Sequence, residues 1–252
     1  MKKIILIVAF LLFSSSLCAQ SADSLFVEAN KLYQQEKYVE SLSLYEQIKA
    51  GNVESDDLYF NMANAYYKTN KIAPAVYYFE KALLLNPNHT DAAYNLTFAR
   101  RMGIDNIEAL PKSIGQKFMD TIILKLTYND WAYIAVICSF LFALLFLMYH
   151  FSYGSGRKRF YFITSILSAI FIVVTVLFAY SNFDYTKNYK TAIVFAEQTD
   201  VKSAPTSSGE IDFELHEGTK VQLLEQLDDW RKIKIADGKI GWISADDIKE
   251  LQ

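Results

Sequence analysis

The sequence predicts a multidomain membrane protein with an α-helical repeat domain, a two-helix transmembrane hairpin and a small C-terminal β-barrel. Three observations support this fold class. A helical pattern repeats over residues 22–101, two long apolar runs follow at 131–149 and 160–180, and residues 189–252 are rich in β-branched residues between turn signals. The hydrophobic fraction of 52% is also above the roughly 45–50% of soluble domains. The chain is therefore expected to be modular and partly embedded in lipid.

The N-terminus has the layout of a secretory signal peptide. Two lysines precede a ten-residue apolar run, 4–13, and Ala19 offers a small residue for cleavage. Such a run is too short to cross about 30 Å of hydrocarbon, so residues 1–19 are expected to be removed. An uncleaved short anchor is one alternative. A lipoprotein acylated at Cys18 is another, and it is disfavoured because Leu17 stands where a small residue is needed.

Composition argues against several classes of function. The only cysteine after the leader is Cys138, inside an apolar run, and the histidines His89, His150 and His216 share no ligand spacing. No set of nucleophile, base and orienting group is recognisable, so we expect no metal, no cofactor and no catalytic residue. The net charge of −3 falls to −5 when the two lysines of the leader are lost, so a nucleic-acid partner is not expected.

The clearest repeat unit runs from Asp56 to His89. Small residues, Ala63 and Ala75, occupy the positions where its two helices would meet, with aromatic residues beside them. This pattern resembles the tetratricopeptide repeat. A weaker copy aligns without a gap over residues 22–55, and a lone first helix follows the clear unit as a cap. The repeat domain is therefore placed at residues 22–101.

The resemblance implies a protein-binding or peptide-binding domain in which the first helix of each hairpin lines a concave groove. The positions that face such a groove are Phe26, Asn30, Tyr33, Phe60, Asn64 and Tyr67. We expect them to bind a partner, and the alternative is that they are packing or solvated residues. Asn30 and Asn61 match the carboxylate clamp of some relatives, but Phe26, Asp91 and Asn95 stand where its cations would be. A peptide with aromatic or aliphatic anchors therefore fits better than an acidic tail.

The two apolar runs, 131–149 and 160–180, have the length of transmembrane helices, at about 1.5 Å per residue. Arg157-Lys158-Arg159 lie in the turn between them, residues 150–159, and the positive-inside rule places this turn in the cytoplasm. A bacterial inner-membrane protein with two spans and both terminal domains in the periplasm is the prediction.

Neither run contains Asp, Glu, Lys, Arg or His, so transport is not expected. The linker before the first run, residues 102–130, includes an amphipathic stretch, 114–126, that suits a membrane surface.

The C-terminal module, residues 189–252, has the signals of short strands. Asp237-Gly238 between two alternating runs predicts a hairpin, and Gly241-Trp242-Ile243 follows it. The order of these elements resembles the bacterial SH3 domain, which implies binding of peptidoglycan or peptides. Trp230 and Trp242 are therefore candidates to stack on a ligand, and the alternative is that they cover the end of the barrel.

The order of modules resembles the BatE family encoded in Bacteroidetes aerotolerance operons. The resemblance implies a membrane complex with von Willebrand factor A domain Bat proteins and a MoxR-type ATPase, linked to envelope or oxidative stress. We expect a non-enzymatic scaffold whose external groove binds partner proteins. The rival interpretation is a peptidoglycan-binding envelope sensor that acts through the SH3-like domain. The short cytoplasmic turn argues against the rival because it is small for a signalling output.

Overall fold

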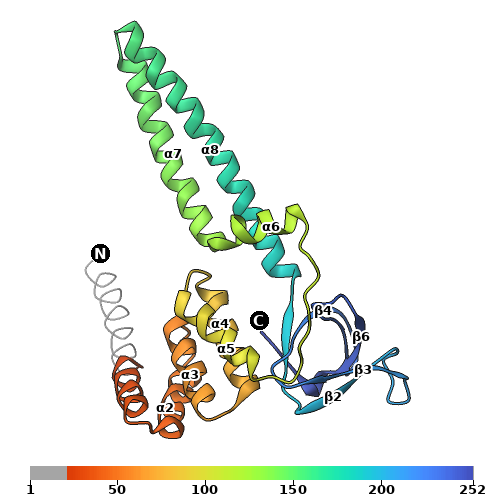
Figure 1. Ribbon diagram of the computed structural model, residues 1–252. Coiled ribbons are helices and arrows are strands. Elements are labelled where there is room, and N and C mark those ends of the chain that lie inside the picture. The colour runs from red at the N-terminus through yellow and green to blue at the C-terminus, as the bar shows by residue number, and fades with distance from the viewer. Residues whose placement is uncertain (1–21, 252) are drawn as a thin grey trace, which may run out of the picture. The chain divides into compact units, whose positions relative to one another are not determined.

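The computed structural model describes residues 22–251, whose contacts group into two compact units. The first unit joins residues 22–85, 89–108 and 191–251, and the second joins residues 86–88 and 109–190 (Figure 1). The predicted signal peptide, residues 1–19, lies outside the described residues and stays a prediction.

The first unit begins with paired helices. These are residues 22–34, α2 (Tyr38–Ala50), α3 (Asp56–Lys68), α4 (Ile72–Leu85) and α5 (Thr90–Arg101). The turn inside each hairpin is the same: Glu36 and Asn70 adopt φ of 62° and 58°. The next residue, Lys37 or Lys71, then donates its amide back to the preceding helix at 3.0 Å. These equivalent turns confirm the register of the predicted repeat.

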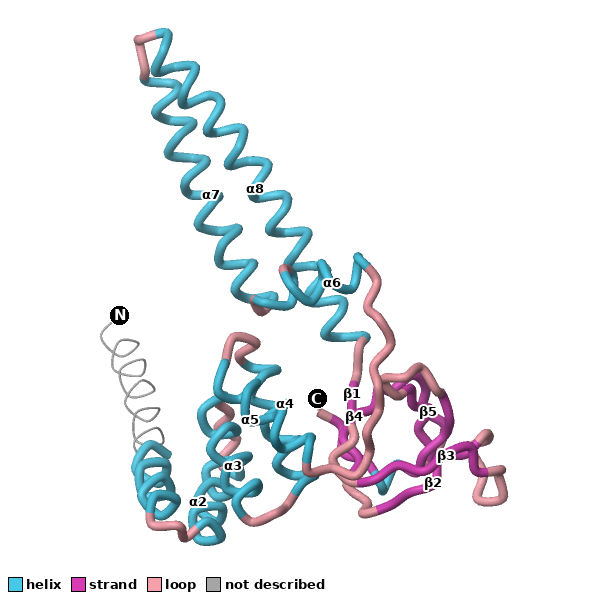
Figure 2. The backbone as a smooth tube through the Cα atoms, viewed as in Figure 1, coloured by secondary structure: helices cyan, strands magenta, loops and turns pink. Residues whose placement is uncertain are grey.

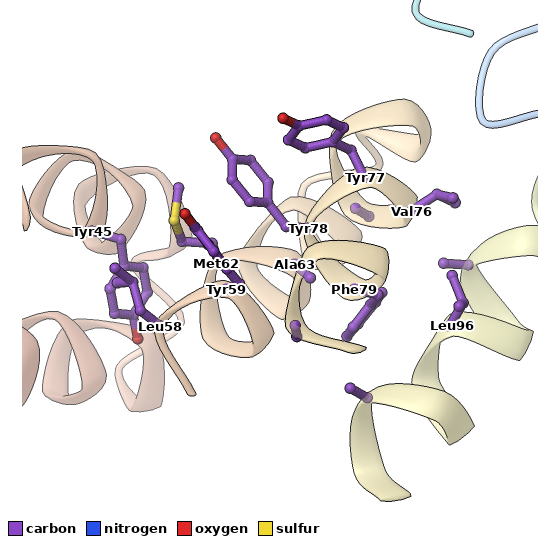
Figure 3. Close-up of a cluster of buried hydrophobic side chains, with 14 of the residues drawn as sticks. Tyr45, Leu58, Tyr59, Met62, Ala63, Val76, Tyr77, Tyr78, Phe79 and Leu96 are labelled. Carbon is purple, nitrogen blue, oxygen red and sulfur yellow. The ribbon is translucent and has the colours of Figure 1, made fainter. Parts of the chain in front are cut away.

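Small residues let the two helices of the second repeat approach. Ala63 in α3 and Ala75 in α4 are fully buried, as their positions in the repeat predict. Larger side chains fill the space beside them, among them Tyr59, Met62 and Phe79 (Figure 3). Each such buried side chain contributes about 1.5–3 kcal/mol through the hydrophobic effect, so this cluster stabilises the packing of the repeat helices.

The C-terminal module forms a curved antiparallel sheet, which we call the barrel (Figure 2). Its strands are β1 (Thr191–Val194), β2 (Gln198–Lys202), β3 (Ile211–His216), β4 (Lys220–Leu227), β5 (Trp230–Lys234), β6 (Ile240–Ser244) and β7 (Ile248–Glu250). They pair in the order β3-β2-β6-β5-β4-β1-β7. Aliphatic side chains from six segments of the sheet fill its interior, with Val201, Ile233 and Ile243 fully buried.

Two glycines in the barrel are required by its geometry. Gly238 has φ of 95° in the hairpin between β5 and β6, where the amide of Ile235 donates to the carbonyl of Lys239 at 3.1 Å. This confirms the predicted hairpin. A Cβ atom on Gly241 would lie 2.5 Å from Cγ1 of Val201, so the Gly-Trp-Ile motif needs a residue without a side chain at its first position.

The barrel and the repeats share a hydrophobic core. Ile193 of β1 and Leu251 after β7 belong to the same buried cluster as Val76 and Tyr77 of α4. The segment that leaves α5 adds a second contact, because Ile107 packs against the interior residues of the barrel. The first unit is thus assembled from segments that lie before and after the apolar helices in the chain.

The second unit contains two long apolar helices. Its elements are α6 (Ile114–Thr121), the short helix η1 (Ile123–Lys125), α7 (Tyr128–Phe151) and α8 (Ser155–Asn188). By length and composition α7 and α8 could each cross a membrane. They lie side by side in antiparallel directions (Figures 1 and 2), and the hydroxyl of Ser168 donates to the carbonyl of Cys138 at 3.0 Å.

The basic residues Arg157, Lys158 and Arg159 lie in the first turn of α8 and not in a loop. The chain between α7 and α8 is limited to residues 152–154, which is shorter than the predicted turn, 150–159. Gly154 is extended and the helix begins directly after it, so the connection needs no further residues.

Candidate functional site

Four asparagines on the first helices of the repeats form what we call the asparagine ladder: Asn30, Asn61, Asn64 and Asn95. Oδ1 of Asn30 accepts a hydrogen bond from Nδ2 of Asn61 at 3.0 Å, and Oδ1 of Asn64 accepts one from Nδ2 of Asn95 at 2.8 Å. The same bond therefore recurs in the next repeat and ties neighbouring first helices together. Sequence reasoning placed Asn30 and Asn64 in the candidate set but left out Asn61 and Asn95, although that pair has the same spacing.

A tyrosine from a second helix supports the first pair of the ladder. The hydroxyl of Tyr45, in α2, donates to Oδ1 of Asn30 at 2.5 Å. With Asn61 this gives the oxygen two donors, which fills its accepting capacity. Burial of the Tyr45 side chain raises the pKa of its hydroxyl, which therefore stays a neutral donor.

The candidate tyrosines stand one helical turn after the ladder asparagines. Tyr33 follows Asn30 by three residues and Tyr67 follows Asn64 by three, so each pair shares a helix face. Tyr33 is half-buried, and the edge of its ring meets Tyr38 with centroids 5.2 Å apart. Tyr67 is also half-buried and packs at the margin of the repeat core. Both tyrosines therefore keep part of the ring free.

The two candidate phenylalanines take part in packing. Phe26 lies 6.0 Å from Tyr45, and Phe60 lies 6.1 Å from Phe79 and 4.7 Å from His89, measured between ring centroids. Both are half-buried at the margin of the core. The structure therefore joins the asparagines in hydrogen-bonded pairs, whereas the rings of Phe26 and Phe60 pack against other aromatic side chains.

Among the described residues one group resembles a metal site: Asp56, Asp57 and His89 have ligand atoms within 4.8 Å of one another. The amide of Ala92 donates to Nδ1 of His89 at 3.2 Å, which makes this histidine the N-cap of α5. In the neutral ring the proton is then on Nε2, the atom that lies 3.9 Å from Asp57. A protonated ring nitrogen cannot bind a metal, so the chemistry favours a helix cap.

The barrel carries a polar cavity of about 490 Å³. Its lining is Gln198, Thr199, Asp200, Lys202, Trp230, Ser244 and Asp247. The hydroxyl of Thr199 donates to Asp247 at 2.6 Å, and the ammonium of Lys202 lies 5.7 Å from the centre of the Trp230 ring. An aromatic wall with donors and acceptors around it can hold a polar ligand that has one flat face.

The two candidate tryptophans differ in position. Trp230 lines the cavity and is half-buried, whereas Trp242 is outside the cavity lining and only 8% exposed. The ammonium of Lys232 lies 5.6 Å from the Trp242 ring centre. Little of the Trp242 side chain is therefore open to a ligand, which favours the alternative that this tryptophan covers the barrel.

A buried carboxylate joins the repeats to the barrel. Glu80 of α4 accepts from Lys220 of β4 at 2.7 Å and also pairs with Arg100 of α5. Burial alone would raise the pKa of Glu80, but the two cations beside it lower it below its ordinary value. Glu80 is therefore charged, and its charge is compensated from both sides.

A second polar link comes from the linker after α5. Asp105 accepts from the amide of His216 at 2.8 Å and from the hydroxyl of Thr219 at 2.6 Å, and its other oxygen lies 2.8 Å from Nδ1 of His216. Burial raises the pKa of Asp105, but the hydrogen bonds from Thr219 and His216 outweigh it and lower the pKa. The linker is thus fixed to the turn between β3 and β4.

Comparison with known proteins identifies both modules. Residues 57–89 match the family described as Tetratricopeptide repeat, and residues 197–249 match the family described as Bacterial SH3 domain. The search among curated proteins gives no significant match. The chain therefore combines a tetratricopeptide repeat, which suggests interaction with other proteins, with a bacterial SH3 domain.

Proposed function

We propose that this protein is a non-enzymatic scaffold of the bacterial inner membrane, whose periplasmic repeat domain binds partner proteins through the asparagine ladder and the adjacent tyrosines. The observation that carries the proposal is the unused hydrogen-bonding capacity of the ladder. Within the described part of the chain, Nδ2 of Asn30 and Oδ1 of Asn61 make no hydrogen bond, nor do Nδ2 of Asn64 and Oδ1 of Asn95.

An extended peptide suits this arrangement. Each peptide residue has one backbone donor and one acceptor, and each ladder pair offers one amide donor and one carbonyl acceptor in return. The half-buried rings of Tyr33 and Tyr67 add apolar contact beside each pair, as anchor sites for side chains of the peptide. The amides are held in place by the bonds inside the ladder, so binding would cost little side-chain entropy.

The topology has independent support. Two apolar helices bring the chain back to the side of the membrane from which it entered, and the repeats and the barrel share one core, which requires both on one side. Arg157, Lys158 and Arg159 at the start of α8 favour the cytoplasm for the opposite end. A phosphatase that is active only in the periplasm serves as the reporter. It should be active when fused at Gln252 and inactive when inserted at Tyr153. The reverse pattern contradicts the orientation.

The candidate partners come from the resemblance to the BatE family, whose order of repeats, hairpin and SH3 domain this chain shares. By that resemblance they are von Willebrand factor A domain Bat proteins, in a complex that responds to oxidative or envelope stress. Purification of the tagged full-length chain from native membranes, followed by mass spectrometry, identifies the proteins that bind.

Substitution of the ladder tests the site itself. In the Asn30→Asp, Asn64→Asp double variant the carboxylates still accept from Asn61, Asn95 and Tyr45, so the fold is retained. Each change replaces the free amide donor by a charged acceptor. Partner recovery should fall at least about tenfold, since an unpaired buried polar contact costs about 1–3 kcal/mol.

The matched control carries the same change of charge at exposed positions, in an Asn106→Asp, Asn129→Asp variant. Its partner recovery should equal that of the wild type. Equal losses in both double variants would show that charge alone is responsible and would reject the ladder as the binding site.

The cavity beside Trp230 favours a second candidate function, recognition of the cell wall by the barrel. Because Ile193 and Leu251 are buried against the repeats, an isolated barrel would expose them, and the full-length chain in nanodiscs is the better probe. Binding to purified peptidoglycan that falls with Trp230→Ala, but is unchanged by the Asn30→Asp, Asn64→Asp variant, would support this function. Absence of binding to peptidoglycan would reject it.

A further inference from the structure

The segment before the first apolar helix is fixed to the helical hairpin by side chains from both helices. Asn182 of α8 is buried, and its Nδ2 donates to the carbonyls of Ile123 at 2.9 Å and Leu126 at 2.7 Å. From α7, Nε1 of Trp131 donates to the same Ile123 carbonyl at 2.9 Å. The irregular chain around η1 therefore has these carbonyls satisfied without water.

Hydrogen bonds from side chains to these backbone carbonyls are important where water is scarce. In the interior of a bilayer an unpaired carbonyl is strongly unfavourable, and non-helical backbone persists only where protein groups pair with it. The N-terminus of α7 is closed in the same way, because Thr127 and Asp130 form a reciprocal capping box. This construction is what a chain at the edge of the hydrocarbon needs.

The contacts of α6 place it at the level where both apolar runs end. Trp131 begins the first run, and Phe178 lies near the end of the second. Phe178 contacts Trp131 with ring centroids 5.0 Å apart and Phe118 of α6 with centroids 6.1 Å apart. Rings of this kind gather where hydrocarbon meets the headgroups of a membrane.

One face of α6, together with the residue that follows the helix, carries exposed apolar side chains. Ile114, Phe118 and Ile122 are 88%, 46% and 40% exposed and follow one another at intervals of four residues, and we call them the interfacial stripe. On the opposite face stand polar residues such as Gln116 and Asp120. An isolated stripe of this kind in water would be unfavourable, but here Phe118 joins it to the apolar helices through its contact with Phe178 of α8.

We propose that α6 is a membrane-binding helix that lies in the plane of the external leaflet, with its interfacial stripe in the boundary between headgroups and acyl chains. The occupant of the stripe is lipid, because Phe118 of the stripe contacts α8, and the exposed side chains of α7 and α8 are themselves apolar. The inference rests on the proposed membrane spans. It would make α6 a fixed support for the chain at the point where it leaves the membrane.

Lipid-dependent quenching tests the proposal in the full-length chain in proteoliposomes. In a Cys138→Ala background, the single variants Ile114→Cys, Gln116→Cys and Phe140→Cys each carry an environment-sensitive fluorophore. The backbone amide of residue 116 still bonds to Ser113 in the Gln116→Cys variant, so the helix keeps its cap. Lipids with a doxyl group near the carbonyl end of the acyl chain should quench the label at position 114 several-fold more than the label at position 116.

Phe140, exposed in the middle of α7, separates this proposal from the one on which it rests. A label there should be quenched most by lipids with the doxyl group near the methyl end. Quenching at position 140 with equal, weak quenching at 114 and 116 would overturn the interfacial helix but keep the spans. Absence of quenching at 140 would overturn both. Disulfide formation between two copies of the Ile114→Cys variant, without quenching of its label, would show that protein covers the stripe and would also overturn the proposal.

Discussion

Glu80 and Lys220 form an ion pair of 2.7 Å across 140 residues of sequence, between α4 of the repeats and β4 of the barrel. The carboxylate is buried and Arg100 contacts its other oxygen, while both cations remain partly exposed. The pair connects the domain that we propose to bind partners with the domain that carries the cavity. Loss of the carboxylate would leave two cations facing each other without compensation.

Glu80→Ala is therefore expected to lower the free energy of unfolding of the first unit by about 2–3 kcal/mol, near the low end for a broken buried pair because Lys220 and Arg100 can turn to solvent. Lys220→Ala should cost less, about 1 kcal/mol, since Glu80 keeps Arg100. Denaturant unfolding of the full-length chain in nanodiscs, monitored by hydrogen exchange of residues 72–85 and 220–227, measures both losses of stability. Equal losses in the two variants contradict the assigned role of Glu80.

Acid should release the linker from the barrel. The pKa of Asp105 is lowered in the folded protein, so its contribution to stability is present above the ordinary aspartate range, about 3.9, and is lost as pH falls through the lower folded value. Protection of the His216 amide, which donates to Asp105, should stay constant at mildly acidic pH and fall below that range. In Asp105→Asn this fall should be absent. A fall of the same size in both proteins would assign it to another group.

The order of modules was predictable because each is encoded by a local pattern. Ala63 and Ala75 sit at positions that recur with the repeat, and Gly238 follows Asp237 in a tight hairpin. Whether Trp242 is buried could not be predicted, because an aromatic residue in a short strand is equally consistent with the wall of a ligand site and with a packed core.

The union of the repeats with the barrel was not predictable from the sequence. Asp105 and His216 are separated by 111 residues, and Glu80 and Lys220 by 140, with both apolar helices between them. A charge on one helix carries no sign of a partner so far along the chain. Asn61 and Asn95 are a different case, since their spacing repeats that of Asn30 and Asn64 and could have completed the candidate site.

Overpacking should test the contact between the helices of the second repeat. Ala75 is fully buried, so Ala75→Leu is expected to cost about 1–3 kcal/mol and to lower the melting temperature by roughly 3–10 °C. Ala93 is exposed on α5, and Ala93→Leu should leave the melting temperature unchanged. Circular dichroism of the full-length chain in detergent follows both. An Ala75→Leu protein that melts like the wild type would reject the assigned helix contact.

A pair of glycines gives a matched test of the barrel. Gly241→Ala places a Cβ atom 2.5 Å from the buried Val201 and should cost about 1–3 kcal/mol, seen as faster hydrogen exchange in β2 and β6. A methyl group added at Gly115 in α6 would have nothing within 4 Å, and Gly115→Ala should stabilise that helix by up to about 1 kcal/mol. Unchanged exchange in Gly241→Ala would contradict the close approach of β2 and β6.

The two tyrosines beside the asparagine ladder should carry much of the affinity for partners. Tyr33 and Tyr67 hold equivalent positions in successive repeats, and each keeps part of its ring free. Truncation of an aromatic anchor at a binding interface costs about 2 kcal/mol or more. The Tyr33→Ala, Tyr67→Ala variant should therefore remain folded and membrane-bound but lose its co-purifying proteins.

Two exposed tyrosines away from the ladder provide the control. Tyr153 between the apolar helices and Tyr180 on α8 are 101% and 67% exposed, so Tyr153→Ala, Tyr180→Ala removes the same number of rings without touching the proposed site. Quantitative mass spectrometry of material purified from native membranes compares the two variants. If partners stay bound in the first variant and are lost with Trp230→Ala, then binding lies in the barrel, because Trp230 lines its cavity and Tyr33 and Tyr67 do not.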